Sequence, residues 1–278
     1  MSRLARASAL ACAAVCATVA LVACSVDVGG VLGVGVGAGR TLRVGVKMDQ
    51  PGLGLRAADG SLHGFDIDVA RYVAAELGVD ASGLSFVEAR PSDREDMLQR
   101  GEVDMVVATY SITPQRRQRV DFAGPYFVAG QSLLVRLKNS DITGPESLDH
   151  RDWRLCAVRG TTGAARIKDD FAGQVSLREY ASYQECVRAL RLGEVDAVTS
   201  DDVILAGYAA QQPEELEVAG RPFSVERYGI GLRKGDPRRA KVNAALRRMI
   251  DDGSWQASAR EHLGRSGYHI PPPPTVEG

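Results

Sequence analysis

Short apolar runs alternate with helical apolar patterns over most of the chain. Thr41 to Val46 is typical of a strand, and apolar residues recur at helical spacing in Phe65 to Leu77, with Asp66 as the expected N-cap. The next expected elements are a strand at Leu84 to Val87, a helix at Ser92 to Arg100 and a strand at Val103 to Ala108, whose near-continuous apolar run indicates burial on both faces. This alternation predicts a parallel sheet with helices on each side.

The same order of elements returns in the second half. Gly-Glu-Val-Asp at Gly101 to Asp104 comes again at Gly193 to Asp196, each time after a helical pattern and before an apolar run, which predicts two lobes of similar build. Lobe 2 is expected to contain strand Arg154 to Val158, helix Gly163 to Phe171, strand Val175 to Glu179 and helix Tyr183 to Leu192. Extended runs at Gln131 to Arg136 and Tyr228 to Arg233 stand where the chain would cross between lobes. A helical stretch from Pro237 to Leu263, broken near Gly253, is expected to pack on lobe 1.

The N-terminal 23 residues have the layout of a secretory signal, with Arg3 and Arg6 before an apolar, Ala-rich stretch that contains no acid. The stretch ends in Leu-Val-Ala-Cys, which resembles the bacterial lipobox, where cleavage leaves Cys24 to carry lipid. The alternative is an uncleaved membrane anchor, because about 17 apolar residues is the lower limit for a membrane span. Both interpretations place the rest of the chain outside the cell.

The remaining boundaries follow from composition. Residues 24–40 are expected to be the lipidated cysteine and a flexible Gly-Val-rich tether. We expect lobe 1 at residues 41–130 and 225–270, lobe 2 at 131–224, and an extended Pro-rich tail at 271–278.

The overall composition is that of a globular protein, with 45% hydrophobic and 25% charged residues, which excludes a disordered chain or a multi-span membrane protein. Lys plus Arg number 34 and Asp plus Glu 35, so the net charge is −1 and no global field attracts nucleic acid. The histidines have no metal-ligand spacing. They are His63, His150, His262 and His269. We therefore expect neither a metal nor a cofactor.

Two cysteines, Cys156 and Cys186, remain once the signal is cleaved and Cys24 is lipidated. Outside the cell an even pair favours a disulfide over two separate buried thiols. A bridge would close a loop of about 30 residues and contribute roughly 3–4 kcal/mol in the chain-entropy account.

Polar residues that suit a small zwitterion follow four of the expected strands. Ligands in open α/β sheets bind beyond the carboxyl ends of the strands. These stretches carry the cations Lys47 and Arg116, several hydroxyl groups, a helix N-terminus after Gly160 and the carboxylate of Asp201. A guanidinium and a helix N-terminus bind a carboxylate, and an aspartate neutralises an ammonium group.

Five ordered stretches resemble a known family: KMDQPGLG, GFDIDVARYVAAELG, VDMVVATYSITPQRRQRVDFAGPYF, CAVRGTTG and VDAVTSDDVILAGYA. They are similar to the extracellular polar amino-acid-binding proteins of ABC importers, above all to glutamate-binding lipoproteins of actinobacteria. The resemblance covers residues 41–265. It implies the type II periplasmic-binding-protein-like fold, an α/β class in which two lobes joined by two crossing strands enclose the ligand.

The resemblance also implies roles for single residues. Arg116, in the Thr-x-x-Arg turn, corresponds to the residue that holds the ligand's α-carboxylate, which the second lobe touches through Thr161 and Thr162. Asp201 corresponds to the residue that takes the α-ammonium group. Thr109 and Ser111 match positions that help to hold the ligand.

Side-chain recognition is expected at Lys47 and Arg94, which match positions that are basic in binders of acidic amino acids. Two cations favour glutamate or aspartate over glutamine, because an amide would leave a desolvated positive charge uncompensated. Without the resemblance, Arg94 would be interpreted as a solvated helix residue and Lys47 as an ordinary strand-end lysine.

The expected function is therefore that of a lipid-anchored, monomeric binding protein on the outer face of the membrane. It would close on glutamate, aspartate or glutamine and present the ligand to an ABC permease with its ATPase subunit, without chemistry on the ligand. The alternatives are an enzyme on the same fold, such as a dehydratase of a carboxylated ring, or an amino-acid sensor with a signalling partner. An enzyme would need an acid or base without an ionic partner.

Overall fold

The computed structural model describes residues 40–139, 141–149, 153–170 and 175–277. The predicted signal, the lipidation site Cys24 and nearly all of the tether lie outside these residues. The described residues belong to one compact unit. Among the described residues, no helix is both long enough and apolar enough to cross a membrane.

The first sheet has five strands in the order β5-β1-β6-β13-β7. β1 pairs in parallel with β5 and β6, whereas β13 is antiparallel to both β6 and β7. The strands are β1 (Leu42–Val46), β5 (Leu84–Glu88), β6 (Met105–Val106), β7 (Asp121–Ala129) and β13 (Glu226–Leu232). The helices on this side are α1 (Phe65–Glu76), α2 (Arg94–Arg100), α3 (Pro114–Arg119), α7 (Arg239–Asp251) and α8 (Ser254–Leu263).

The second sheet has five strands in the order β10-β9-β11-β8-β12. β9 pairs in parallel with β10 and β11, and β8 runs antiparallel between β11 and β12. The strands are β8 (Gln131–Arg136), β9 (Arg154–Val158), β10 (Ser176–Tyr180), β11 (Ala197–Asp201) and β12 (Leu216–Ala219). The helices are the short η1 (Pro145–Asp149), α4 (Thr162–Asp170), α5 (Tyr183–Arg191) and α6 (Asp202–Gln211).

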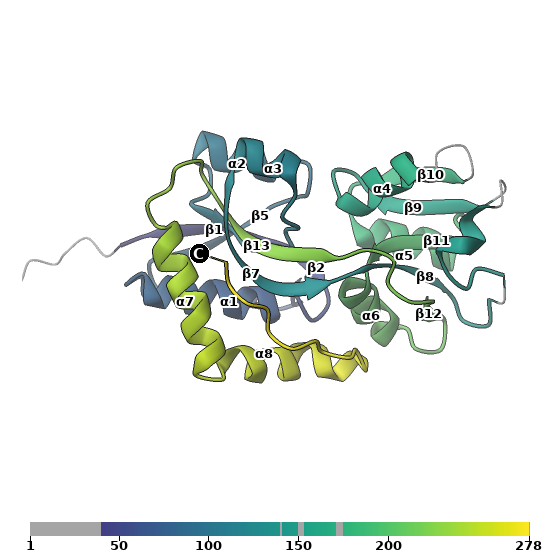
Figure 1. The fold of residues 1–278 in the computed structure, drawn as a ribbon. Coiled ribbons are helices and arrows are strands. Elements are labelled where there is room, and N and C mark those ends of the chain that lie inside the picture. The colour runs from purple at the N-terminus through teal and green to yellow at the C-terminus, as the bar shows by residue number, and fades with distance from the viewer. Residues whose placement is uncertain (1–39, 140, 150–152, 171–174, 278) are drawn as a thin grey trace, which may run out of the picture. The chain divides into compact units, whose positions relative to one another are not determined.

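The predicted parallel pairing is present among β5, β1 and β6 and among β10, β9 and β11, but both sheets are mixed, because β7, β8, β12 and β13 pair antiparallel. The chain passes from the first sheet to the second between β7 and β8, at Gly130, and returns between β12 and β13, as Figure 1 shows. Each strand entered directly from the other sheet therefore runs against its neighbours. Both crossings are short, so they tie the two sheets together at two adjacent points.

A small third sheet follows β1. It is antiparallel and consists of β2 (Asp49–Gln50), β3 (Gly54–Arg56) and β4 (Leu62–His63). Helix α1 starts after Gly64, so the expected N-cap role of Asp66 is wrong. Asp66 lies in the first turn, fully buried, where its carboxylate accepts hydrogen bonds from other elements instead.

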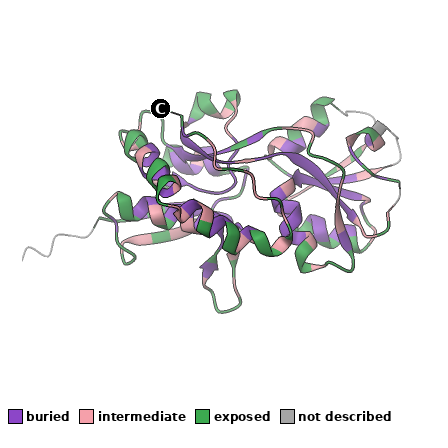
Figure 2. Ribbon diagram, turned by 60° about the horizontal axis from the view of Figure 1, so that its bottom comes forward, coloured by how far each residue is buried: buried purple, intermediate pink, exposed green. Residues whose placement is uncertain are grey.

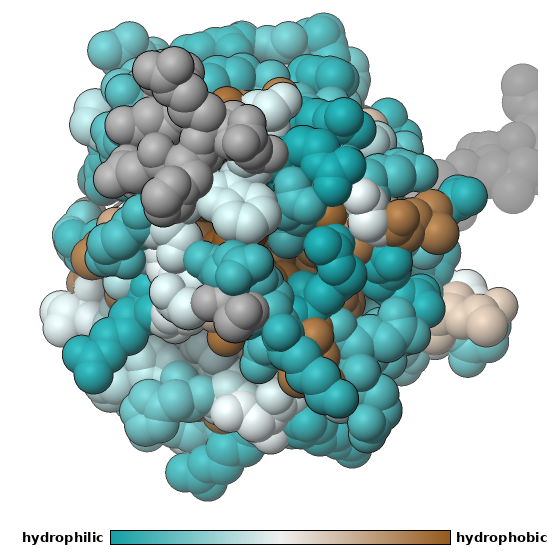
Figure 3. All heavy atoms as spheres, turned by 90° about the vertical axis from the view of Figure 1, so that its right-hand side faces the viewer, coloured by the Kyte–Doolittle hydropathy of each residue, from teal (hydrophilic) through white to brown (hydrophobic). Residues whose placement is uncertain are grey.

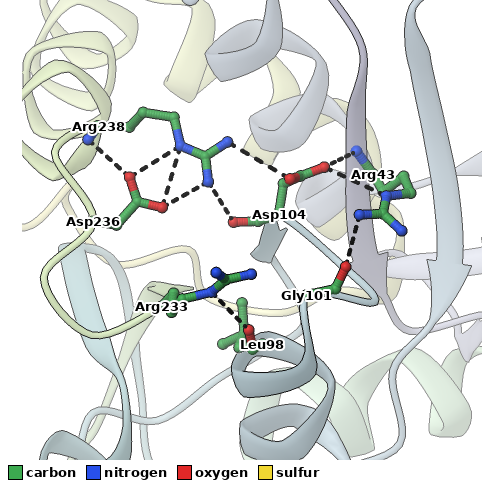
Figure 4. Close-up of polar contacts among 7 residues, drawn as sticks. All are labelled: Arg43, Leu98, Gly101, Asp104, Arg233, Asp236 and Arg238. Carbon is green, nitrogen blue, oxygen red and sulfur yellow. Dashed lines mark hydrogen bonds and ion pairs between the residues drawn. The ribbon is translucent and has the colours of Figure 1, made fainter.

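The repeated Gly-Glu-Val-Asp motif forms the same contacts in both sheets, at the amino ends of the central strands. Asp104 and the first sheet's Arg43 exchange hydrogen bonds, with the Arg43 N–H donating to the carboxylate at 2.8 Å and the Asp104 N–H to the Arg43 carbonyl at 2.8 Å (Figure 4). Asp196 and Arg154 do the same in the second sheet, at 2.9 and 2.7 Å. The repeat therefore has a structural role, because it joins the start of each central strand to the neighbouring strand by hydrogen bonds.

The apolar core lies between the sheets and their helices, where Figure 2 shows buried strands and buried inner helix faces. Trp255 of α8 is buried and donates from Nε1 to the Tyr126 carbonyl at 2.7 Å, which fixes α8 against β7. The expected break before α8 is at Gly253, whose φ of 84° suits glycine. On the face of the second-sheet side shown in Figure 3, the visible surface is mostly hydrophilic, with scattered apolar side chains.

The predicted disulfide is confirmed: it joins Cys156 of β9 to Cys186 of α5, with Cα atoms 5.6 Å apart. Both residues are fully buried. The bridge therefore ties one helix of the second sheet to a central strand.

Candidate ligand-binding site

A small pocket lies where the carboxyl ends of β1, β6, β9 and β11 face one another across the two sheets. Seven of the eight predicted ligand-binding residues line it, and Lys47 does not. The lining residues are Gln50, Pro91, Arg94, Thr109, Ser111, Arg116, Thr161, Thr162, Gly163, Tyr183, Asp201 and Ile204. Residues from both halves of the chain thus meet in one hollow.

Arg116 extends from α3 across the pocket. Its Nη1 donates to the Ser111 carbonyl at 2.8 Å and its Nη2 to the Gly160 carbonyl at 3.1 Å, so the side chain links the first sheet to the turn after β9. Its Nε lies 3.5 Å from a carboxylate oxygen of Glu95. The α3 helix that carries it begins at Pro114 and is capped by the Thr113 hydroxyl, which accepts the Arg116 N–H at 3.2 Å.

Arg94 is buried beside Arg116. Its Nε donates to the Ala89 carbonyl at 3.3 Å, and its guanidinium lies 5.2 Å from the ring centre of Tyr110, which Arg116 approaches at 5.0 Å. Burial lowers the pKa of Arg94, and the positive charge of Arg116 lowers it further. Two adjacent guanidinium groups with little water around them favour an anionic group beside them in the pocket.

Thr109, which follows the apolar run of β6, has φ of 45°, a region that threonine rarely adopts. Its N–H donates to the buried Asp66 carboxylate at 2.7 Å, and its single hydroxyl hydrogen is shared between the Ala108 carbonyl at 2.8 Å and Gln50 Oε1 at 3.2 Å. These bonds hold the strained residue in place. Burial raises the pKa of Asp66 to about 6, against the hydrogen bonds from Tyr126 and Thr109.

The second sheet contributes the start of α4. The Thr161 hydroxyl caps this helix by accepting the Ala164 N–H at 3.1 Å while donating to the Val158 carbonyl at 2.7 Å. Thr162 donates from Oγ1 to Glu226 at 3.0 Å. The free N–H groups and partial positive charge of the helix start favour a negative group here.

Asp201 ends β11 and is 6% exposed. Its carboxylate accepts a hydrogen bond from the Tyr228 hydroxyl, which comes from β13 of the first sheet. Burial raises the pKa of Asp201 to about 8, with the negative charge of Glu226 acting in the same direction. Such a carboxylate is stabilised by any cationic group that enters the pocket.

Lys47 is buried away from the lining residues. Its Nζ lies 2.9 Å from Asp49 Oδ1, and its side chain is 1% exposed. The lysine charge is therefore balanced within the same loop. Gln50, three residues further on, takes the pocket position.

The sequence reasoning missed five lining residues and two supporting ones. The lining residues are Gln50, Pro91, Gly163, Tyr183 and Ile204. The supporting residues, Glu226 and Tyr228, lie on β13, beyond every strand end that the sequence singled out. Gln50 lies in the stretch that follows the first strand, which the sequence analysis had already singled out. The alternation of side chains between the two faces of that stretch was the available sign that Gln50 could line the pocket.

A family model of bacterial extracellular solute-binding proteins, family 3, matches residues 42–265. The chain belongs to this family. The glutamate-binding protein GluB of Corynebacterium efficiens is 44% identical over 275 residues, covering 95% of this chain and 93% of that protein. The family resemblance of the sequence is thereby confirmed.

Solved structures agree with the type II periplasmic-binding-protein-like fold, which is confirmed. An ancestral arginine-binding protein bound to glutamine is 34% identical with a TM-score of 0.75, covering 81% of this chain and 98% of that chain. An ancestral amino acid-binding protein described as a precursor of cyclohexadienyl dehydratase is 32% identical with a TM-score of 0.72, covering 80% of this chain and 95% of that chain.

Proposed function

We propose that this protein binds a free amino acid, with glutamate favoured, for uptake by an ABC importer. The observation that carries the proposal is that Arg116 and Asp201, opposite charges from opposite sheets, line one pocket. A zwitterion satisfies both. Its α-carboxylate binds Arg116 and the start of α4, and its ammonium group binds Asp201.

Arg94 recognises the side-chain carboxylate in this proposal. It is the buried cation among the lining residues of the pocket, whereas the charge of Lys47 is paired with Asp49. A second carboxylate near Arg94 is stabilised by an ion pair in a site with little water, which an amide does not provide. The name of the similar Corynebacterium protein, a glutamate-binding protein, agrees with this preference.

Delivery is proposed from family membership and the N-terminal sequence together. The protein is held at the outer face of the membrane by lipid on Cys24, is monomeric, and presents the closed, ligand-bound form to a permease whose ATPase subunit lies inside. Its two lobes, 41–130 with 225–270 and 131–224, close by rotation at the crossings near Gly130 and before β13.

The test is calorimetry of the purified protein with glutamate, aspartate, glutamine and asparagine. We expect Arg94→Ala to weaken glutamate binding at least tenfold and glutamine binding much less. Arg90→Ala is the matched control, since it removes an equal charge from an exposed position of the same segment. Lys47→Ala tests whether the lysine contributes despite its pairing. Equal losses for the acid and the amide in Arg94→Ala would refute the side-chain assignment.

An enzyme is the second candidate, because the similar ancestral structure is described as a precursor of a dehydratase. In that case Asp201, protonated near neutral pH, would act as an acid. Incubation with carboxylated cyclohexadienyl compounds, followed by product analysis, decides between the two. Turnover that Asp201→Asn abolishes would favour the enzyme, and glutamate binding without turnover would favour the binding protein.

A further inference from the structure

The last segment of the chain, residues 264–277, begins at the end of the family match and lies against the first chain crossing and against strands β7 and β13. It starts with the short helix η2 (Gly264–Ser266), which packs on α6 of the second sheet. From there it runs back beside β7, as the yellow end of the ribbon shows in Figure 1. The Tyr268 ring lies 6.5 Å from the Phe127 ring of β7.

One end of the segment is attached at the first crossing. The Tyr268 hydroxyl donates to Asp202 Oδ1 at 3.2 Å. The same oxygen accepts the Gly130 N–H at 3.2 Å, and the Asp202 N–H donates to the Gly130 carbonyl at 2.7 Å. Gly130 is the single residue between β7 and β8, and Asp202 directly follows Asp201 of the pocket. Tyr268 therefore binds Asp202, the residue that holds the crossing at Gly130 through two hydrogen bonds.

The other end is attached beside the pocket wall of the first sheet. Val276 is 8% exposed, and the Glu277 N–H donates to the Gly124 carbonyl of β7 at 3.0 Å. The Glu277 carboxylate lies 2.6 Å from Arg227 of β13 and 3.4 Å from Arg117 of α3. Arg117 follows Arg116, and Arg227 precedes Tyr228, whose hydroxyl binds Asp201. Glu277 thus joins the two elements that orient the charged groups of the pocket.

We propose that residues 264–277 form a strap that restrains the crossing at Gly130 and the adjoining strands β7 and β13, and thereby positions Arg116 and Asp201, with Tyr268 and Glu277 as its attachment residues. The effect on ligand affinity rests on the proposed function; the restraint itself does not. Glu277 is 48% exposed, and exposed ion pairs contribute little to global stability. The strap therefore acts on local opening at the Gly130 crossing and along β7 and β13, which costs less free energy than global unfolding.

Hydrogen exchange of the full chain without ligand tests the restraint. In Tyr268→Phe we expect amide exchange in peptides spanning Gly130 and Asp202 to accelerate two- to tenfold. Tyr72→Phe is the matched control, because it removes an equivalent hydroxyl that donates to Asp252 at 2.5 Å within the first-sheet side alone. That variant should leave exchange at Gly130 and Asp202 unchanged.

Glu277→Gln tests the second attachment and keeps the residue's size. We expect faster exchange around Gly124 and Arg227, and Glu102→Gln serves as its control, since Glu102 has the same 48% exposure and also pairs with an arginine at 2.6 Å. Melting temperatures within about 2 °C of the parent would show that each variant still folds.

Calorimetry with glutamate then measures the consequence for binding, where both strap variants should weaken affinity two- to fivefold. Unchanged exchange in both variants would overturn the strap. Accelerated exchange with unchanged affinity would overturn its role in positioning the site. If the parent protein binds no glutamate, the proposed function fails, while the exchange data still decide whether the strap exists.

Discussion

The two sheets are alike at the amino ends of their central strands and unlike at the carboxyl ends. At the amino ends an arginine and an aspartate exchange backbone hydrogen bonds in both, Arg43 with Asp104 and Arg154 with Asp196. At the carboxyl ends the first sheet presents two guanidinium groups, whereas the second presents a helix start and the carboxylate of Asp201. Scaffold contacts are thus repeated and internally satisfied.

The pocket groups, in contrast, are only partly satisfied within their own sheet. Burial and the neighbouring charge of Arg116 lower the pKa of Arg94. Burial and the neighbouring charge of Glu226 raise the pKa of Asp201. In the proposed function, a zwitterion supplies the missing partners, with its carboxylate group near the guanidinium groups and its ammonium group near Asp201. The comparison therefore separates residues whose charges are satisfied within the fold from residues that we propose to bind the ligand.

The largest expected effect is at the carboxyl ends. Arg116→Ala removes the cation that reaches both walls, so we expect glutamate, aspartate and glutamine to lose at least about 100-fold in affinity, as charge-assisted bidentate bonds are strong. Calorimetry measures the loss. Binding of any of the three within tenfold of the parent would mean that Arg116 does not hold the common carboxylate.

The next effect concerns a difference between the sheets, since among the described residues only the second carries a disulfide. Replacing Cys156 and Cys186 together by alanine should lower the free energy of unfolding by about 2–4 kcal/mol. Urea unfolding, monitored by circular dichroism and by exchange in each sheet, measures it. We expect peptides of β9 and α5 to lose protection before those of β1, and uniform loss would contradict an effect centred on the second sheet.

A smaller effect follows from the charge state of Asp201. Its pKa of about 8 means that the carboxyl group is largely protonated at pH 6.5, and an ammonium ligand must displace that proton. Glutamate affinity should therefore rise up to about tenfold between pH 6.5 and 7.5, over which glutamate itself keeps its charge. Asp201→Asn should bind weakly and without this dependence. A flat profile for the parent would show that Asp201 is already ionised.

The raised pKa of Asp201 also affects the stability of the fold. Because the pKa of Asp201 is raised in the folded protein, the folded state holds its proton more tightly, and the contribution of Asp201 to stability falls as pH rises from about 4 to 8. Asp201→Asn removes this loss. Its melting temperature should exceed that of the parent at pH 8 and approach it at pH 5.

Much of the scaffold was predictable from local pattern. Arg154–Val158 and Gln131–Arg136 form strands with the expected bounds, because a short apolar run ended by polar residues leaves little choice of where the strand begins and ends. Strand β7 was not expected, since Gly124 and Pro125 lie within it and both are typical of turns.

The lining of the candidate pocket was predictable where position along a strand decides it, as for Thr109 and Asp201. It was not predictable where the direction of a side chain decides. Lys47 and Gln50 stand in one loop, and only the fold shows that Lys47 turns toward Asp49. Tyr228 reaches Asp201 through pairing of distant strands, which no spacing in the sequence records.

The smallest effect compares the two repeated aspartates directly. Asp196 is 13% exposed, and its carboxylate accepts two parallel bonds from the Arg154 side chain at 3.0 and 2.7 Å. Asp104 is 30% exposed, and the arginine side-chain nitrogen nearest to its carboxylate lies 3.7 Å away. We therefore expect Asp196→Asn to lower the free energy of unfolding by about 1–2 kcal/mol and Asp104→Asn by about 0.5–1 kcal/mol. Hydrogen bonds from Arg154 outweigh burial and lower the pKa of Asp196, so its contribution is present above about pH 4 and is lost as pH falls through the folded-state value. Urea unfolding at pH 7 and pH 3 measures both variants. The loss of stability in Asp196→Asn should be smaller at pH 3 than at pH 7. Equal losses for the two variants at pH 7 would mean that the repeat contributes through its backbone bonds alone.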